Sequence, residues 1–285
     1  LKAIQNYLDE QHRRGGDHGK AKPQEPNRFR CQWHIPEKQP LVELIIPTRD
    51  KSKILGLAID SILAKTNYSN YTLTIVNNQS VEKATLQLFE KLTRENPKKI
   101  KILAYDEKFN YSAINNYAVK QSDAEIIGLI NNDIEVISDE WLSEMVSHAL
   151  RTDVGCVGAK LFYSNGTIQH GGVIIGIGAI AGHAHKYFPG ESPGYVDRLK
   201  YSQQLSAVTA ACLLVRRTIF KEVGGLNEQD LKVAFNDVDF CLRVHARGYR
   251  NIFTPYAQLY HHESVSRGDD NTPAKKKRFN KEVDF

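Results

Sequence analysis

The sequence predicts an α/β protein with a mostly parallel central sheet, and three observations support this fold class. First, apolar segments of strand length alternate with amphipathic segments of helix length from residue 41 to residue 150, as in a doubly wound parallel sheet. Second, the run 126–130 is apolar throughout, as strands buried on both faces are. Third, several apolar runs end in polar turn formers, and ligands bind at such strand ends. We therefore expect a ligand crevice at this edge of the sheet.

The elements of this first region follow in a regular order. Each helix is predicted from apolar residues that recur on one face, such as Ile54, Leu57, Ala58 and Ile62 in the first one. Strands are expected at 41–46, 71–76, 101–104 and 126–130, and helices at 52–64, 82–94, 113–120 and 139–150. Ser112 is expected to cap the third of these helices. The loops 47–50, 77–80 and 131–133 each follow a strand, so they should gather at one edge of the sheet.

After residue 150 the alternation becomes irregular, which predicts a smaller, mixed half. Strands are expected at 155–162, 208–216, 251–254 and 257–260, and helices at 218–223 and 237–247. The glycine-rich stretch 166–182 suggests strands or loops with close backbone approach. Residues 183–206 are expected to form a mobile loop. Residues 1–11 are expected to form a short helix, followed by a linker up to residue 38, and the charged end of the chain to be solvated.

Composition is typical of a soluble globular protein, with 41% hydrophobic and 25% charged residues in a chain of 285. The net charge of +5 permits an anionic substrate. It does not indicate nucleic acid, for which the run Lys275–Arg278 is the sole feature. Four cysteines without metal-ligand spacing indicate a reducing compartment, and we expect a cytoplasmic protein. The chain begins at Leu1 without a visible signal peptide, and we expect it to be part of a longer protein.

The triplet Asn131-Asn132-Asp133 directly follows the buried strand 126–130. Asp133 is its only carboxylate, and hard divalent cations take carboxylate oxygens together with substrate phosphates. The triplet therefore indicates a metal site. The alternative is a turn of asparagine and aspartate residues that merely ends a strand.

Two carboxylates and two histidines are further candidates. On a helix that begins at Asn236, Asp237 and Asp239 point about 200° apart, so only one of them can act as a base, and Asp237 in the first turn is favoured. Strand alternation puts His261 and His262 on opposite faces, so one should face the crevice and bind metal or phosphate. The alternatives are an acidic helix start and a surface histidine pair.

Taken in order, these segments resemble the family 2 glycosyltransferases with the GT-A fold, especially the bacterial polysaccharide and O-antigen type. The resemblance covers about residues 40–268. It is carried by Ile45–Asp50, Ile75–Ser80, Phe109–Asn115, Leu129–Val136, Ala210–Arg217, Asn236–Gly248 and His261–Ser264. It implies a Rossmann-related sheet flanked by helices, with a smaller acceptor-side half. The resulting division is an N-terminal extension or linker (1–38), a nucleotide-sugar-binding half (39–150), an acceptor-binding and catalytic half (151–268) and a charged tail (269–285).

The resemblance also implies a role for each matched position. Asp237 would be the catalytic base, while Asp133 and His261 would hold a divalent cation, Mn²⁺ or Mg²⁺. The residues implied in binding the donor nucleotide are Pro47, Thr48, Arg49, Asp50, Asn77, Asn110, Asn115, Asn131 and Asn132. Further candidates are His262, Asp239, Asn236 and Arg216, the last with Arg217 as a contact to phosphate or as a plain surface pair. Asparagine stands at 77, 131 and 236, where the family commonly has acids, so the site is less anionic.

The expected activity is transfer of a hexosyl or deoxyhexosyl group from a nucleotide-diphosphate sugar to an acceptor hydroxyl, with inversion and with a divalent cation. The expected acceptor is a growing glycan, free or lipid-linked, with peripheral association at the inner face of the membrane and no nucleic acid partner. A nucleotidyltransferase is disfavoured because 47–51 is not a glycine-rich, basic loop. A non-catalytic glycan- or nucleotide-binding module stays open as an alternative because of the three asparagines.

Overall fold

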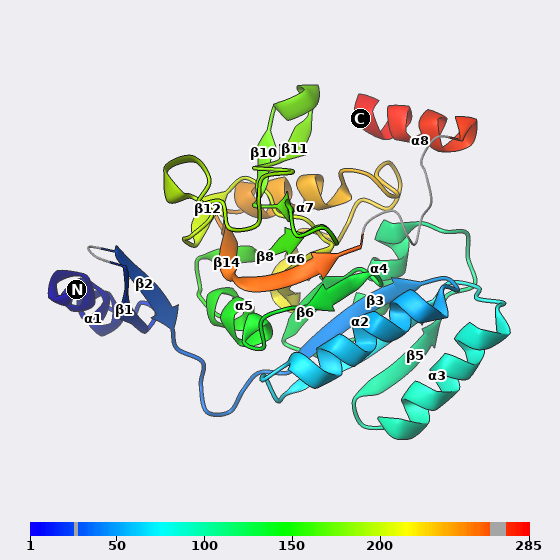
Figure 1. The fold of residues 1–285 in the computed structure, drawn as a ribbon, viewed down its shortest axis with the longest axis horizontal. Helices are drawn as coiled ribbons and strands as arrows, with labels where there is room; N and C mark the ends of the chain where they lie inside the picture. Colours follow the sequence, from blue (N-terminus) through cyan, green and yellow to red (C-terminus); the bar gives the residue numbers. More distant parts are fainter. Residues whose placement is uncertain (26–27, 263–271) are drawn as a thin grey trace.

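The computed structural model describes residues 1–25, 28–262 and 272–285. Its centre is a large mixed sheet in the order β12-β14-β8-β13-β6-β3-β4-β5 (Figure 1). The parallel part consists of β3 (Val42–Thr48), β4 (Tyr71–Asn77), β5 (Ile100–Ala104) and β6 (Ile126–Ile130). The predicted fold class, α/β with a mostly parallel central sheet flanked by helices, is confirmed.

The second half of the chain extends the same sheet. β8 (Val154–Phe162) and β14 (Arg250–His261) are parallel to each other, whereas β13 (Cys212–Arg216) runs antiparallel to both β6 and β8. The short strands at this side are β7 (Ile134–Val136), β9 (Ile168–His170) and β12 (Gln203–Leu205). β10 (Val173–Ile175) and β11 (Ala181–His183) form a separate hairpin, which projects at the top of Figure 1.

Helices cover both faces of the sheet, and alternate residues of β3 show how. Leu44 and Ile46 belong to one core, whereas Ile45 belongs to the other, since successive strand residues point to opposite faces. The first core includes residues of α2 (Ser52–Lys65), α3 (Lys83–Glu95) and α5 (Trp141–Ala149). The second includes residues of α4 (Tyr111–Lys120), α6 (Arg217–Glu222) and α7 (Asn236–Ala246).

The strand ends that carry polar loops meet at one edge, as predicted. β3 and β4 are in register from Val42 opposite Tyr71 to Thr48 opposite Asn77. Asn131, which follows the end of β6, donates its backbone N–H to the carbonyl of Ala211 at 3.0 Å. The segments 47–50, 77–80 and 131–133 thus line the same edge.

Two local details differ from the prediction. The segments 251–254 and 257–260 form one strand, β14, with an irregularity between Thr254 and Gln258 in its pairing with β8. The cap of α4 is Asn110, whose Oδ1 accepts from the backbone N–H of Ala113 at 3.1 Å. Ser112 instead donates to the carbonyl of Leu231 at 2.6 Å. Asn110, two residues earlier, takes the cap position because asparagine is among the preferred N-cap residues.

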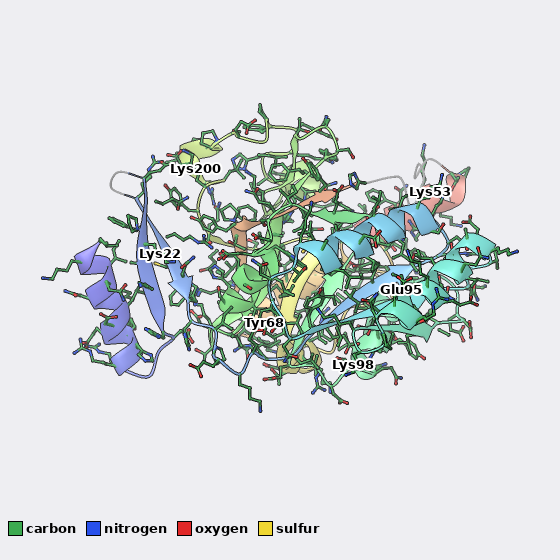
Figure 2. All side chains as sticks on the ribbon, turned by 60° about the horizontal axis from the view of Figure 1, so that its bottom comes forward. Lys22, Lys53, Tyr68, Glu95, Lys98 and Lys200 are labelled. Carbon is green, nitrogen blue, oxygen red and sulfur yellow. The ribbon has the colours of Figure 1, made fainter. Side chains whose placement is uncertain are left out.

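The expected linker between residues 12 and 38 is wrong. After α1 (Lys2–Arg13), the strands β1 (Gly19–Glu25) and β2 (Arg28–Trp33) form a hairpin. Arg30 of β2 pairs with the buried Glu144, and Lys200 pairs with Glu25 at 3.1 Å. Figure 2 shows Lys200 on the loop facing the hairpin that carries Lys22. The polar hairpin is therefore held by long-range ion pairs, which a local sequence pattern does not reveal.

Within the expected solvated tail, the described residues 272–285 contain a helix, although most of their side chains are exposed as predicted. α8 (Pro273–Asp284) includes Lys276, Lys277 and Arg278, and it buries Glu282 to 4% exposure. The matched positions Glu263 and Ser264 and the predicted boundary at 268 lie outside the described residues. Within the described part of the chain, none of the helices combines the length and the apolar character needed to cross a bilayer.

Candidate active site

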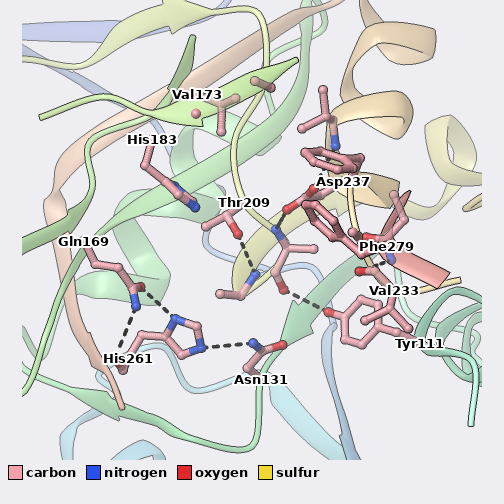
Figure 3. A pocket seen from close by; sticks show the side chains of 18 of the residues that line it. Tyr111, Asn131, Gln169, Val173, His183, Thr209, Val233, Asp237, His261 and Phe279 are labelled. Atoms are coloured by element: carbon pink, nitrogen blue, oxygen red, sulfur yellow. Dashed lines mark hydrogen bonds between the residues drawn. The ribbon is translucent and has the colours of Figure 1, made fainter. Parts of the chain in front are cut away.

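Two adjoining cavities open at this edge of the sheet. The first, which we name the β3 cavity, has a volume of about 430 Å³ and is lined by residues 47–51 together with Asn78, Glu82, Phe109, Tyr111, Ile114, Asn131, Asn132, Val233 and Arg278. The second, the α7 cavity, has a volume of about 340 Å³ and includes Asp133, Gln169, His183, Asp237 and His261 in its lining (Figure 3). Tyr111, Asn131, Val233 and Arg278 line both cavities, so a single elongated ligand can occupy the two.

The loop at the end of β3 is held in an uncommon backbone conformation. Asp50 and Lys51 have φ of 53° and 62°, a region that costs free energy for residues other than glycine and is enriched at functional sites. The Oδ1 of Asp50 accepts from the N–H groups of Val81 and Glu82 at 2.9 and 2.8 Å. These bonds fix the loop that forms the floor of the β3 cavity.

Two amide side chains complete this cavity. Asn132 donates to Thr48 Oγ1 at 2.9 Å, which joins the loops after β3 and β6. Asn78, which the sequence reasoning missed, is 1% exposed and donates to the carbonyls of Tyr105 and Glu107. Its Oδ1 is buried and has no hydrogen-bond partner among the described residues. The sequence signal that pointed to the adjacent Asn77, a polar residue at the end of a strand, applies equally to Asn78.

His261 and Asp133 lie against each other in the lining of the α7 cavity. His261 Nε2 lies 3.1 Å from Asp133 Oδ1 and 3.0 Å from Asn131 Nδ2. Its Nδ1 lies 2.7 Å from Gln169 Oε1, as Figure 3 shows. Because an amide oxygen only accepts, Nδ1 carries a proton, and in the neutral ring the lone pair of Nε2 faces the carboxylate.

This arrangement fits a divalent cation. The carboxylate of Asp133 and the imidazole of His261 would hold it, and Gln169 would orient the ring through its second nitrogen, as partners of metal-ligating histidines commonly do. Among the described residues no group of three or more His, Cys, Asp or Glu side chains is placed to hold a metal. The remaining ligands would therefore be water and substrate phosphates, which is usual for Mg²⁺ in phosphate-binding sites.

Asp237 lies on the opposite wall, in the first turn of α7. Its Oδ2 accepts from the N–H of Ala210 at 3.0 Å and its Oδ1 from that of Val238 at 2.9 Å. Asp239 pairs with Arg243 at 2.7 Å, away from the cavity lining. The two carboxylates thus face different surroundings, as the helical spacing predicts. Asn236 is buried in the lining and donates to the carbonyl of Val233 at 3.1 Å.

Three asparagines that were expected to contact the nucleotide form hydrogen bonds within the protein. Asn77 Oδ1 accepts from the N–H of Ser80 at 2.9 Å and so holds the turn after β4. Asn110 caps α4 and donates to the carbonyl of Glu228, and Asn115 is fully buried and donates to the carbonyl of Tyr111. None of the three is among the residues that line the two cavities. They support the walls, whereas Tyr111 in the same segment reaches both cavities.

Arg216 and His262 also lie elsewhere. Arg216 pairs with Ile126 at the start of β6, the edge opposite to the cavities, and donates to the carbonyls of Thr152 and Val154. Of the two alternatives for Arg216, this position disfavours a contact to phosphate. His262 lies 3.1 Å from Glu135, outside the cavity that His261 lines, as strand alternation predicts.

A second histidine pair adjoins the α7 cavity. His170 Nδ1 lies 2.7 Å from His183 Nδ1, and His183 lines the cavity. Burial, with the nearby His183 and His261, lowers the pKa of His170 well below its ordinary value, so His170 is neutral near neutral pH. The sequence shows these histidines but offers no spacing that pairs them.

Comparison with known proteins gives a family model and longer relatives. The model described as "Glycosyl transferase family 2" matches residues 43–224. The chain is 53% identical to "Uncharacterized protein y4gI" of Sinorhizobium fredii over 91% of its length, and 36% identical to "O-antigen biosynthesis protein RfbC" of Myxococcus xanthus over 95%. It spans 28% and 21% of the lengths of these two proteins.

Solved structures share the fold at low sequence identity. A mannosyltransferase, PcManGT from Pyrobaculum calidifontis, solved with GDP-Man and Mn²⁺, has a TM-score of 0.63 at 14% identity, with 98% of this chain and 71% of that chain covered. GalNAc-T7 with UDP, GalNAc and Mn²⁺ has a TM-score of 0.69 at 12% identity, with 94% and 51% covered.

Proposed function

The chain belongs to glycosyl transferase family 2, and from this premise we propose that it transfers a sugar from a nucleotide-sugar donor to a hydroxyl group of a growing glycan. The observation that carries the proposal is the junction of the two cavities. A strained loop with amide side chains lines one of them, and Asp133, His261 and Asp237 line the other. The relative named for O-antigen biosynthesis supports a polysaccharide acceptor.

The donor would lie across both cavities. Its nucleoside would occupy the β3 cavity beside 47–51, Asn78 and Asn132, and its sugar would enter the α7 cavity. Asn78 lines this cavity, and the amide of Asn132 keeps Thr48 in place. This placement leaves the diphosphate near Asn131, which lines both cavities.

Asp237 would act as the general base. It would accept the proton of the acceptor hydroxyl as that oxygen attacks the anomeric carbon, and a single displacement of this kind inverts the configuration. The N–H groups of Ala210 and Val238 fix the orientation of the carboxylate, which a base needs in order to meet a particular hydroxyl. Arg243 holds Asp239 away from this role.

Asp133 and His261 would hold a divalent cation, Mn²⁺ or Mg²⁺. When bound, the cation supplies Lewis-acid stabilisation of charge on the leaving diphosphate. Both structures named above as sharing this fold were solved with Mn²⁺, which supports this assignment. Gln169 would keep the Nε2 lone pair of His261 directed at the cation.

The proposal can be tested with a panel of nucleotide sugars. UDP-, GDP- and dTDP-sugars are incubated with the chain and Mn²⁺, and released nucleoside diphosphate is measured with and without glycan acceptors. We expect release from at least one donor and loss of release in the Asp133→Ala variant. If nucleotides bind but no donor is consumed in any combination, the chain is a non-catalytic binding module instead.

A further inference from the structure

Arg278 lines the site from the end of the chain, together with Phe279 of the same helix. It belongs to α8, which lies outside residues 43–224 that match the family model. Its side chain is 31% exposed, and it lines both the β3 cavity and the α7 cavity. The charged run that contains it looked like a solvated tail in the sequence, so neither motif nor spacing assigns it a role.

Specific contacts hold α8 over the two cavities. Glu282, with 2% of its side chain exposed, accepts from the N–H groups of Val233 and Ala234 at 3.1 and 2.9 Å. The ring centroids of Phe279 and Phe235 lie 5.6 Å apart. Figure 3 shows Phe279 beside Val233 and Asp237. The helix therefore rests on the segment that leads directly into Asp237.

The charges around Arg278 indicate what it can bind. The α7 cavity contains the carboxylates of Asp133 and Asp237, and Arg278 is the only Lys or Arg in its lining among the described residues. Arg278 Nε also forms an ion pair with Glu282 Oε1 at 3.8 Å. An anionic group brought between the cavities would meet two acids and this guanidinium.

We propose that Arg278 binds the diphosphate of the nucleotide-sugar donor, with Glu282 as the residue that positions it. The inference rests on the proposed function, which puts the nucleoside in one cavity and the sugar in the other. The group between them is then the diphosphate, and Arg278 lines both sides of that junction. A guanidinium carries five N–H donors in a planar fork that suits two phosphate oxygens at once.

The rival explanation is that Arg278 only stabilises α8 through Glu282. The two explanations differ in how they treat mono- and diphosphates. A diphosphate contact affects nucleoside diphosphates selectively, because a monophosphate bound at the β3 cavity does not extend as far into the junction. A purely structural role changes the affinity for both by the same factor, or changes neither.

The test is calorimetric titration with Mn²⁺ of UDP, GDP, ADP and dTDP and of the matching monophosphates. For the nucleotide whose nucleobase binds best to the unaltered chain, Arg278→Gln should lower the affinity for the diphosphate about 10- to 100-fold. The monophosphate should change by less than about threefold. Arg278→Lys, which keeps the charge but loses the fork, should fall between the two. Lys277→Gln removes an exposed charge from the same helix and should leave both affinities unchanged.

Glu282→Gln tests the positioning role. It should lower the melting temperature and reduce the preference for diphosphate over monophosphate in the same direction as Arg278→Gln. If Arg278→Gln does not fold, Arg278→Lys carries the comparison. An unchanged preference in the folded Arg278 variants would overturn the assignment while leaving the proposed function in place. If no nucleotide binds the unaltered chain, the proposed function and this inference fail together.

Discussion

At the scale of single residues, the two acids of α7 have separate roles. Asp237 lines the α7 cavity, whereas Asp239 pairs with Arg243, which also donates to the carbonyls of Val223 and Gly225. A general base contributes about 10²- to 10⁴-fold to the rate. We therefore expect Asp237→Asn and Asp239→Asn to have different effects, although the chemical change is the same in both.

Asp237→Asn should lower the turnover by about 10²- to 10⁴-fold and leave nucleotide affinity within about twofold. Asparagine has the same shape and can still accept from one of the two N–H groups that Asp237 accepts from, so the fold should be retained. Asp239→Asn is the matched control, and it should lower the melting temperature more than the turnover. Steady-state kinetics with saturating donor measures the difference. Full activity in Asp237→Asn together with an inactive Asp239→Asn would reverse the assignment.

Gln169 provides a second prediction at this scale. Gln169→Leu removes the acceptor that fixes the tautomer of His261 and should weaken Mn²⁺ binding about 10- to 100-fold. His261→Ala should weaken it further, whereas His262→Ala, on the far side with Glu135, should have no effect. The bound fraction of Mn²⁺ can be followed by electron paramagnetic resonance. Unchanged Mn²⁺ affinity in His261→Ala would remove this residue from the metal site.

The residue scale also shows which site residues can be predicted from the sequence and which cannot. Strand alternation separates His261 from His262, and helical spacing separates Asp237 from Asp239, and both separations are present in the structure. Gln169, Asn78 and Tyr111 reach the cavities through contacts between distant segments. No local periodicity reports such contacts, so these three residues were not predicted.

At the scale of elements, the N-terminal hairpin is tied to α5 by a buried ion pair. Burial raises the pKa of Glu144, but the hydrogen bond and charge of His148, the charge of Arg30 and the hydrogen bond of Thr254 outweigh it and lower the pKa from 4.5 to about 2. The folded value lies below the unfolded one. Its stabilisation is therefore present above about pH 4.5 and is lost as the pH falls toward 2.

Glu144→Gln should remove this pH dependence. The shift corresponds to about 3 kcal/mol of unfolding free energy at neutral pH, so the unaltered chain should lose about that much more than the variant between pH 5 and pH 2. Urea unfolding at several pH values measures it, with Glu95→Gln as an exposed control. If the curves of the unaltered chain and Glu144→Gln run parallel, the ion pair does not carry this stability.

Elements also differ in how well the sequence predicts them. The strands β3, β4 and β6 are rich in aliphatic residues and almost entirely buried, so the apolar pattern of the sequence predicts them. The hairpin β1–β2 and helix α8 are polar, and they are stabilised by Arg30 with Glu144 and by Glu282 with the backbone of Val233 and Ala234. Their partners are far away in the sequence, which is why both segments looked like solvated chain.

At the scale of the whole molecule, one sheet edge brings together segments that are up to about 230 residues apart in the chain. The binding loop at 47–51 comes from the first half, and Asp237, His261 and Arg278 come from the second. The alternation of strands and helices predicts that edge, but the junction of the two cavities depends on how β13, β14 and α8 pack beside it. The central claim is that this junction holds a nucleotide diphosphate together with a divalent cation.

The most direct test of this claim is a thermal-shift titration of the chain with UDP, GDP, ADP and dTDP, in Mn²⁺ and in chelator. We predict that one diphosphate stabilises the chain by about 2.7 kcal/mol at 100 times its dissociation constant in Mn²⁺. The stabilisation should disappear in chelator and in Asp133→Ala. Equal stabilisation in Mn²⁺ and in chelator, or none with any nucleotide, would contradict the account.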